Sequence, residues 1–197
     1  MARIEPLPRE ELPQHEPIFK MVESAMGFVP SSMLTMAKAP GLLEAFGGLA
    51  GTIGGMGAID RGLSQMIANM VSNAAGCRYC QAHTATHAAH AGVDADKVAA
   101  IWEFETNELF SEAERAALRV ARDAAQIPNA TTDEQFAALA QHFDEQQVIQ
   151  IVATISMFGY LNRWNDTMAT TLEAEPLGFA NQHLAANGWE AGKHAGE

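Results

Sequence analysis

Signals that start and stop α-helices recur from one end of this sequence to the other. Asp60 and Asp144 each precede an apolar pattern of helical period, and Ser111 with Glu114 has the spacing of a capping box. No window shows sustained alternation of apolar and polar residues, and no β-branched run is bounded by turns. The sequence therefore predicts an all-α fold.

The same signals predict where each helix lies. We expect helices over residues 17–27, 31–38, 40–49, 60–76, 77–91, 94–104, 111–126, 132–143 and 144–172. The apolar stretch 41–59 contains Glu44 and many glycines, so we expect a closely packed helix followed by a mobile loop there, not a membrane span. The length suits one domain over residues 1–197, with a core at about 15–175 and a flexible tail at about 185–197.

The charge balance excludes several classes of partner. The chain has 12 Lys and Arg residues against 24 Asp and Glu residues, a net charge of -12, and such a surface repels nucleic acids and anionic lipids. Pro6, Pro8, Pro13 and Pro17 stand among charged residues, in a pattern that the apolar region of a secretory signal does not tolerate. We therefore expect a cytoplasmic protein that binds neither nucleic acid nor membranes.

The two cysteines, Cys77 and Cys80, are separated by two residues. In a reducing compartment a lone close pair is more often reactive or metal-binding than a structural disulfide, because bridging so short a loop removes little chain entropy. At a helix start, unpaired backbone N–H groups stabilise a thiolate, and a second sulfur one turn away is within disulfide reach. The spacing indicates a dithiol redox couple.

Histidines continue the pattern after the cysteines. His83 lies three positions after Cys80, on the same helical face, where an imidazole can move a thiol proton, and His87 and His90 extend the stripe. The alternative is that they are ordinary polar residues on a partly exposed helix face. Cys77, Cys80 and His83 could share a zinc ion, but Cys77 and His87 would lie about 15 Å apart on one helix, so a fourth ligand must come from elsewhere. We expect no metal and no cofactor.

The segment 65–92, with residues 72–83 at its heart, resembles the alkylhydroperoxidase D core of the carboxymuconolactone decarboxylase superfamily. The motifs at 27–30 and 162–166 resemble its peroxidase-related branch, so the similarity covers about residues 15–175. The resemblance implies an all-α helical bundle that assembles as trimers or hexamers. It also implies a thiol peroxidase that reduces hydroperoxides and is recycled by a dithiol donor of the lipoyl or thioredoxin kind.

The resemblance also implies roles for residues. In the family the second cysteine attacks the peroxide and the first resolves the sulfenic acid, which makes Cys80 the nucleophile and Cys77 the resolving thiol. The helix-start argument by itself favours Cys77 as the reactive thiolate. The position of the family's relay Glu holds Gln65, which cannot accept a full proton, and the position of its usual His holds Thr84, so His83 becomes the proton carrier.

Three functional hypotheses follow from these observations. The first is a thiol-dependent oxidoreductase that reduces hydroperoxides or disulfides through Cys77 and Cys80. The second is a lactone decarboxylase like the founding branch of the superfamily, which needs no sulfur. The third is a non-enzymatic module that senses redox state or binds zinc.

A weak internal repeat relates the two halves of the chain. Sliding the sequence by 85 positions aligns Cys77 and Cys80 with Asn162 and Asn165 and keeps the apolar rhythm around them. One interpretation is a duplicated helical hairpin, and the other is chance. A true duplication would mean that the scaffold does not need sulfur at this place.

Overall fold

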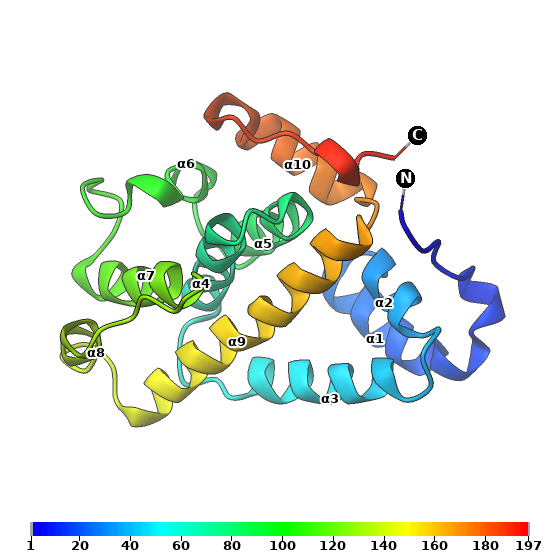
Figure 1. Cartoon of the computed structure of the whole chain (residues 1–197), viewed down its shortest axis with the longest axis horizontal. Coiled ribbons are helices and arrows are strands. Elements are labelled where there is room, and N and C mark those ends of the chain that lie inside the picture. The colour runs from blue at the N-terminus through cyan, green and yellow to red at the C-terminus, as the bar shows by residue number, and fades with distance from the viewer. Residues whose placement is uncertain (1, 197) are drawn as a thin grey trace.

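The computed structural model describes residues 2–196, and no strand occurs in them. This confirms the predicted all-α class (Figure 1). The helices are α1 (Glu16–Met26), α2 (Ser31–Met36), α3 (Leu42–Gly55), α4 (Arg61–Ala74), α5 (Arg78–His90), α6 (Ala95–Ala99), α7 (Glu112–Ala124), α8 (Asp133–Leu139), α9 (Glu145–Met168) and α10 (Ala174–His183). Among the short 3-10 turns, η5 (Gly192–His194) closes the C-terminal segment.

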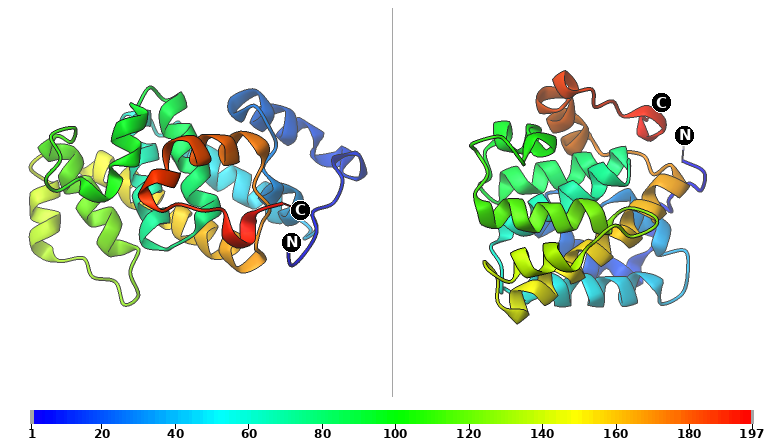
Figure 2. Two further views of the ribbon diagram at one scale, coloured as in Figure 1. Left: turned by 90° about the horizontal axis from the view of Figure 1, so that it is seen from above. Right: turned by 60° about the vertical axis from the view of Figure 1, so that its left-hand side comes forward.

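Helices α4 and α5 form an antiparallel pair at the centre of the molecule. Helix α7 packs on α4, the long α9 crosses both, and α10 lies over α5, as the views from two further directions show (Figure 2). Apolar residues from these five helices meet in one core that includes Ile67, Ala85, Leu118, Ile151 and Ala180. The start of α5 therefore lies between α9 and the C-terminal segment.

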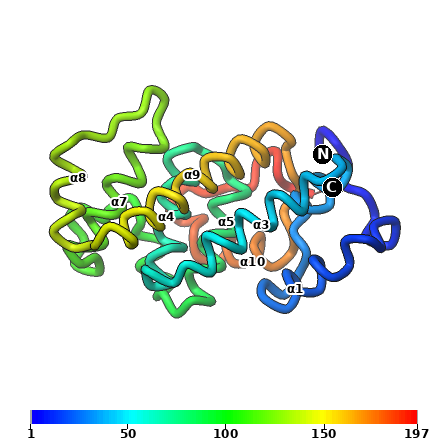
Figure 3. The backbone as a smooth tube through the Cα atoms, turned by 90° about the horizontal axis from the view of Figure 1, so that it is seen from below, coloured from blue at the N-terminus to red at the C-terminus, as the bar shows by residue number. Residues whose placement is uncertain are grey.

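A second, smaller apolar cluster holds the N-terminal part together. It consists of Leu12, Phe19, Met33, Met36 and Leu43, which come from the N-terminal segment, α1, α2 and the start of α3. Seen from below, α3 and α9 run across this face of the molecule, with α1 at one end (Figure 3). Burial of these side chains ties the first forty residues to the rest of the domain.

The predicted helix starts are confirmed by their caps. Asp60 Oδ1 accepts the backbone N–H groups of Gly62 and Leu63 at the start of α4. Ser111 and Glu114 form a reciprocal capping box at the start of α7, and the same device opens α8 and α9. These bonds satisfy backbone donors that have no partner within the helix.

Helix α3 differs from its prediction. We expected a helix that ends near Leu49 and a mobile loop after it, but the helix continues through the glycines to Gly55. A Cβ atom added at Gly47, Gly48 or Gly51 would meet no atom within 4 Å, so close packing is not the reason for these glycines. In the part of the chain that is described, no helix is both long and apolar enough to cross a bilayer.

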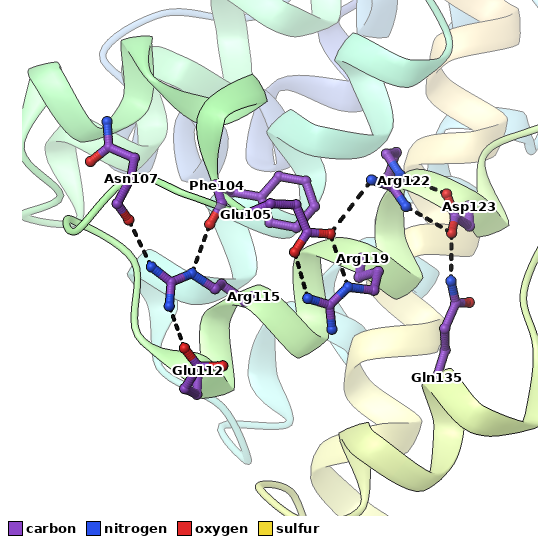
Figure 4. Close-up of polar contacts among 9 residues, drawn as sticks. All are labelled: Phe104, Glu105, Asn107, Glu112, Arg115, Arg119, Arg122, Asp123 and Gln135. Atoms are coloured by element: carbon purple, nitrogen blue, oxygen red, sulfur yellow. Dashed lines mark hydrogen bonds and ion pairs between the residues drawn. The ribbon is translucent and has the colours of Figure 1, made fainter.

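Arginines of α7 hold the segment between α6 and α7 (Figure 4). Arg115 donates to the carbonyl oxygens of Phe104 and Asn107, each at 2.9 Å, and Arg119 Nε donates to Glu105 Oε1 at 2.9 Å. Four of the five acidic side chains in the stretch 103–114 are exposed, and Glu105 and Glu114 form ion pairs. The stretch is therefore fixed against α7 by charge-assisted hydrogen bonds.

The internal repeat does not correspond to two helical hairpins. The first copy contains the turn between α4 and α5 at residues 75–77, whereas the matching residues 160–162 lie inside the uninterrupted α9. Two residues that the repeat aligns are nevertheless in contact, because Asn165 Nδ2 donates to the sulfur of Cys80. The interpretation of a duplicated hairpin is wrong for the second copy.

The C-terminal segment also differs from its prediction. We expected a flexible tail at about residues 185–197. After helix α10 the structure instead has the turn η5 there, and the side chain of His194 is completely buried. The backbone N–H of Leu172 donates to the carbonyl oxygen of His194 at 2.9 Å, and Trp189 Nε1 donates to the carbonyl oxygen of Arg78 at 3.3 Å. The segment is thus attached to the start of α5.

Candidate active site

Cys77 is the residue that caps the N-terminus of α5. The turn before it is closed by Gly76, whose φ of +73° is a left-handed conformation that favours glycine. The backbone N–H of Cys77 donates to the carbonyl oxygen of Ser72 at 3.1 Å, and its Sγ accepts the backbone N–H of Cys80 at 3.4 Å. A sulfur at this place faces the positive end of the helix dipole, which favours the thiolate.

Cys80 lies one turn further on and faces α9. Both cysteines are free thiols and buried. Asn165 Nδ2 donates to Cys80 Sγ at 3.5 Å. Burial raises the pKa of the Cys80 thiol well above its ordinary value, the adjacent Cys77 raises it further, and the hydrogen bond from Asn165 lowers it in part. The two sulfurs are therefore unequal, because Cys80 stays protonated at neutral pH while Cys77 caps a helix.

A carboxylate and an imidazole lie beside Cys77. Its Sγ, a carboxylate oxygen of Asp166 in α9 and a ring nitrogen of His194 in η5 are all within 4.8 Å of one another. His194 Nδ1 lies 2.8 Å from the carbonyl oxygen of Thr170, and Lys193 Nζ lies 2.8 Å from Asp166 Oδ2. Burial lowers the pKa of the His194 imidazole. Arg163, three residues before Asp166, does not pair with it but donates to the carbonyl oxygen of Gly159 in α9.

A second ionisable group lies on the other side of Tyr79. Glu173, in the link between α9 and α10, lies 2.6 Å from His83 Nε2 and accepts hydrogen bonds from the Tyr79 hydroxyl at 2.9 Å and the Ser31 backbone N–H at 2.5 Å. Burial by itself would raise the pKa of the Glu173 carboxyl, but the hydrogen bond and charge of His83 and the N–H of Ser31 outweigh it, and the net pKa is lowered. The Tyr79 pKa is raised well above its ordinary value, chiefly by burial.

His87 continues this side of α5 beyond His83. Its ring stacks on Phe28 with centroids 6.4 Å apart, and its buried Nε2 has no hydrogen-bond partner in the described part of the chain. Burial, with the neighbouring His83 and His90, lowers the pKa of His87 to about 3. His87 is therefore a neutral imidazole at physiological pH.

The structure separates the predicted site residues into two groups. Cys77 and Cys80 lie together, whereas the hydrogen bond of His83 goes to Glu173, and within residues 2–196 none joins His83 to a sulfur. Gln65 lies on α4, and its buried Oε1 has no partner. The view of His83 as part of a partly exposed face is wrong, because the ring is 7% exposed.

The sequence analysis did not identify Glu173 or His194 as site residues, and it gave Asp166 no role in the site. No local signal could have identified the two missed residues, because they follow the cysteines by more than ninety positions and reach the site only through the packing of α9, α10 and the C-terminal segment. The motif at 162–166 was the one available indication, since it contains Asn165 and Asp166.

A pocket of about 720 Å³ opens between α4, α7, α8 and α9. Its wall mixes apolar side chains, among them Val71, Ala75 and Ile155, with polar ones that include Asn162 and Asp166. A carboxylate oxygen of Asp166 lies within 4.8 Å of Cys77 Sγ. Asn162 is 3% exposed, and within residues 2–196 neither its Nδ2 nor its Oδ1 has a hydrogen-bond partner. An unpaired buried amide is costly, so this group is suited to bind a polar atom of a ligand.

The model of the carboxymuconolactone decarboxylase family matches residues 40–123. The debrominase Bmp8 is 40% identical to this chain in solved structures that superimpose with a TM-score of 0.85, over 91% of this chain and 96% of that one. This chain belongs to the carboxymuconolactone decarboxylase family. The resemblance predicted from residues 65–92 is confirmed. The structures of Bmp8 include the apo protein and a cysteine-to-alanine variant in complex with 2,3,4-tribromopyrrole.

Two further relatives are more distant. The alkylhydroperoxidase D core of an uncharacterized peroxidase-related protein from Ralstonia eutropha JMP134 is 23% identical, with a TM-score of 0.79 over 91% of this chain and 95% of that one, and shows the same fold. The uncharacterized protein YnjA of Escherichia coli (strain K12) is 27% identical over 110 residues. That match covers 56% of this chain and 60% of YnjA, less than two thirds of its length.

Proposed function

We propose that this protein is a two-cysteine oxidoreductase in which Cys77 and Cys80 together reduce a small organic substrate by two electrons. The observation that carries the proposal is the pair of free thiols at the N-terminus of α5, where Cys77 Sγ accepts the N–H of Cys80. Burial raises the pKa of the Cys80 thiol, so the two sulfurs differ in their surroundings. Such a pair can attack once and then close a disulfide.

The substrate class that we propose is a halogenated aromatic ring. Identity of 40% over nearly the full length of a debrominase supports this choice. In the proposed reaction the thiolate sulfur bonds to bromine, the C–Br electron pair stays on carbon and takes a proton, and a sulfenyl bromide results. The second thiol then displaces bromide and forms the disulfide. The overall balance is R–Br plus two thiols giving R–H, a disulfide and HBr.

The pocket beside Asp166 fits a substrate of this class. Its volume of about 720 Å³ is in the range of small-molecule sites, and apolar side chains such as Val71 and Ile155 are available to contact a halogenated ring. The amide of Asn162 is available for a ring N–H or hydroxyl. In this arrangement the apolar side chains would contact the ring while the amide of Asn162 sets its orientation beside Asp166.

Turnover requires that the disulfide be reduced again. A dithiol donor of the lipoyl or thioredoxin kind, expected from the sequence, is the reductant that we propose. Assembly as a homo-oligomer and a cytoplasmic location likewise remain predictions from the sequence.

A single-turnover experiment tests the proposal without knowledge of the donor. Fully reduced protein is mixed anaerobically with pyrroles that carry one to four bromines. We expect one bromide released, one Cys77–Cys80 disulfide formed and one hydrogen gained by the product per chain, the last becoming deuterium in heavy water. Cys77→Ser and Cys80→Ser should each abolish the disulfide. Debromination by the double serine variant would contradict the proposal.

Hydroperoxide reduction is the second candidate. The Glu173–His83 pair favours it, because the resemblance implies a Glu–His proton relay. The carboxylate of this pair comes from the link between α9 and α10, whereas the resemblance placed it at position 65. The balance is ROOH plus two thiols giving ROH, water and a disulfide. The same single-turnover assay with an alkyl hydroperoxide decides between the substrates, since the faster disulfide formation identifies the better oxidant.

A further inference from the structure

The C-terminal segment carries a buried histidine to the start of α5. Two contacts hold His194 to the segment that follows α9. The backbone N–H of Leu172 donates to the carbonyl oxygen of His194, and the ring Nδ1 of His194 lies 2.8 Å from the carbonyl oxygen of Thr170. The His194 side chain is completely buried. A buried imidazole that only filled space would be a costly choice for this position.

The hydrogen bond to Thr170 decides the tautomer of the ring. A carbonyl oxygen can only accept, so Nδ1 of His194 carries the proton and Nε2 of the neutral ring is a proton acceptor. Nε2 lies 3.7 Å from Asp166 Oδ1, beyond hydrogen-bond distance, and has no hydrogen-bond partner within residues 2–196. This nitrogen can therefore accept a proton, and a ring nitrogen of His194 lies within 4.8 Å of Cys77 Sγ.

The groups around the ring come from three parts of the chain. Asp166 lies on α9, Lys193 precedes His194 in η5, and Cys77 and Tyr79 belong to the start of α5, the Tyr79 ring centroid being 5.9 Å away. Burial lowers the pKa of His194, so the ring is neutral and able to accept a proton at physiological pH. Asp166 is placed to stabilise the imidazolium once it forms.

We infer that His194 is the proton acceptor for Cys77, so that the C-terminal segment completes the dithiol site. The proton moves from Cys77 Sγ to His194 Nε2, which leaves a thiolate and an imidazolium beside the Asp166 carboxylate. Sulfur and nitrogen lie within 4.8 Å, a gap that a small rotation of the thiol or one water spans. The use of the thiolate rests on the proposed function, but the ionisation of Cys77 itself needs no substrate.

A metal ion is the competing explanation for the same three residues. Lys193 Nζ, however, already forms an ion pair with Asp166 Oδ2 at 2.8 Å, and its positive charge repels a metal cation at the same carboxylate. The donors number three, one fewer than a closed structural zinc site uses. Proton transfer needs neither a fourth donor nor the displacement of Lys193.

The test measures the ionisation of Cys77 directly. The chain has two cysteines, so the Cys80→Ser variant leaves Cys77 as its one thiol. The rate of its alkylation by iodoacetamide is followed against pH in this background, alone and with His194→Asn. The asparagine amide can still donate to Thr170 but offers no group in the place of Nε2. His183→Asn, which alters a half-buried histidine of α10, is the matched control.

We expect His194→Asn to raise the alkylation midpoint by about one pH unit or more, a tenfold or greater loss of rate at neutral pH. The His183→Asn control should leave the profile unchanged. An unchanged profile in His194→Asn would overturn the inference and leave the dithiol chemistry standing. A shifted profile in a protein that reduces no substrate would uphold the inference and reject the proposed function.

A second measurement covers the case in which the variant loosens the segment. In the intact reduced protein, the ring resonances of His194 should titrate together with Cys77 and should change when Cys77 is replaced by Ser. A His194 ring that does not respond to Cys77→Ser would contradict the role. Stoichiometric zinc that is released on alkylation of the purified protein would also overturn it.

Discussion

Glu173 Oε2 lies 2.6 Å from His83 Nε2, which joins the link between α9 and α10 to the middle of α5. Both side chains are buried to more than 85%, so the pair is shielded from water and salt. The carboxylate also accepts two hydrogen bonds, from Tyr79 and from the backbone of Ser31. Glu173 therefore holds α2, α5 and the α9–α10 link together.

The first prediction concerns this carboxylate. Glu173→Gln keeps an oxygen acceptor but loses the charge, so we expect a loss of about 1–3 kcal/mol in the free energy of unfolding, measured by urea denaturation at pH 7. Because the pKa of Glu173 is lowered in the folded protein, its contribution is present above the unfolded pKa and is lost as the pH falls through the folded value. The difference between variant and wild type should shrink below about pH 4. Equal stability at pH 7 would contradict a role in holding the three elements.

The second prediction is a pH dependence from His87. Its folded pKa is about 3 against 6.5 when unfolded, so below pH 6.5 the unfolded chain binds a proton that the folded chain does not. Stability should fall as the pH drops from 6.5 toward 3, by at most about 5 kcal/mol from this group. His87→Gln should flatten that slope, while His142→Gln, at an exposed site, should not. The readout is the urea midpoint between pH 7 and pH 4, and parallel slopes would argue against a buried neutral His87.

Local chemistry explains which parts of the fold were predictable. The caps at Asp60, Ser111 and Asp144 depend on bonds within three residues, so the sequence contained all the information needed to place those helix starts. The extent of α3 was not predictable in this way. A glycine in a helix costs about 1 kcal/mol relative to alanine, but contacts of α3 with α2 and α9, which no local pattern reveals, favour the longer helix.

The candidate site likewise has one part that the local sequence predicts and one part that it does not. The Cys77–Cys80 spacing predicts two sulfurs at a helix start, and the structure has them there, because one helical turn fixes their separation. The proton-carrying partners depend instead on tertiary packing. His83 is near Cys80 in sequence but bonds Glu173, whereas His194 is 117 positions from Cys77 and lies beside it.

The third prediction distinguishes the two sulfurs. In Cys77→Ser the remaining thiol, Cys80, is buried, and we expect it to react with iodoacetamide with a midpoint above pH 9. In Cys80→Ser the remaining Cys77 should react at a clearly lower pH, because it caps the helix and lies beside His194. The measurement is the alkylation rate by mass spectrometry across pH 5–11. A lower midpoint for Cys80 would instead support the family assignment of Cys80 as the attacking residue.

The fourth prediction concerns the pocket and Asn162. If its unpaired amide binds a polar atom of the substrate, Asn162→Ala should raise KM for a bromopyrrole about tenfold, the worth of one hydrogen bond of about 1.4 kcal/mol, with a smaller change in kcat. Stability should not fall through loss of a hydrogen bond, because the amide makes none with the described residues 2–196, and removal of an unpaired buried amide offsets the loss of its packing. Asn181→Ala, at an exposed position of α10, is the control. Steady-state kinetics with a dithiol donor give both constants, and an unchanged KM would place the substrate outside this pocket.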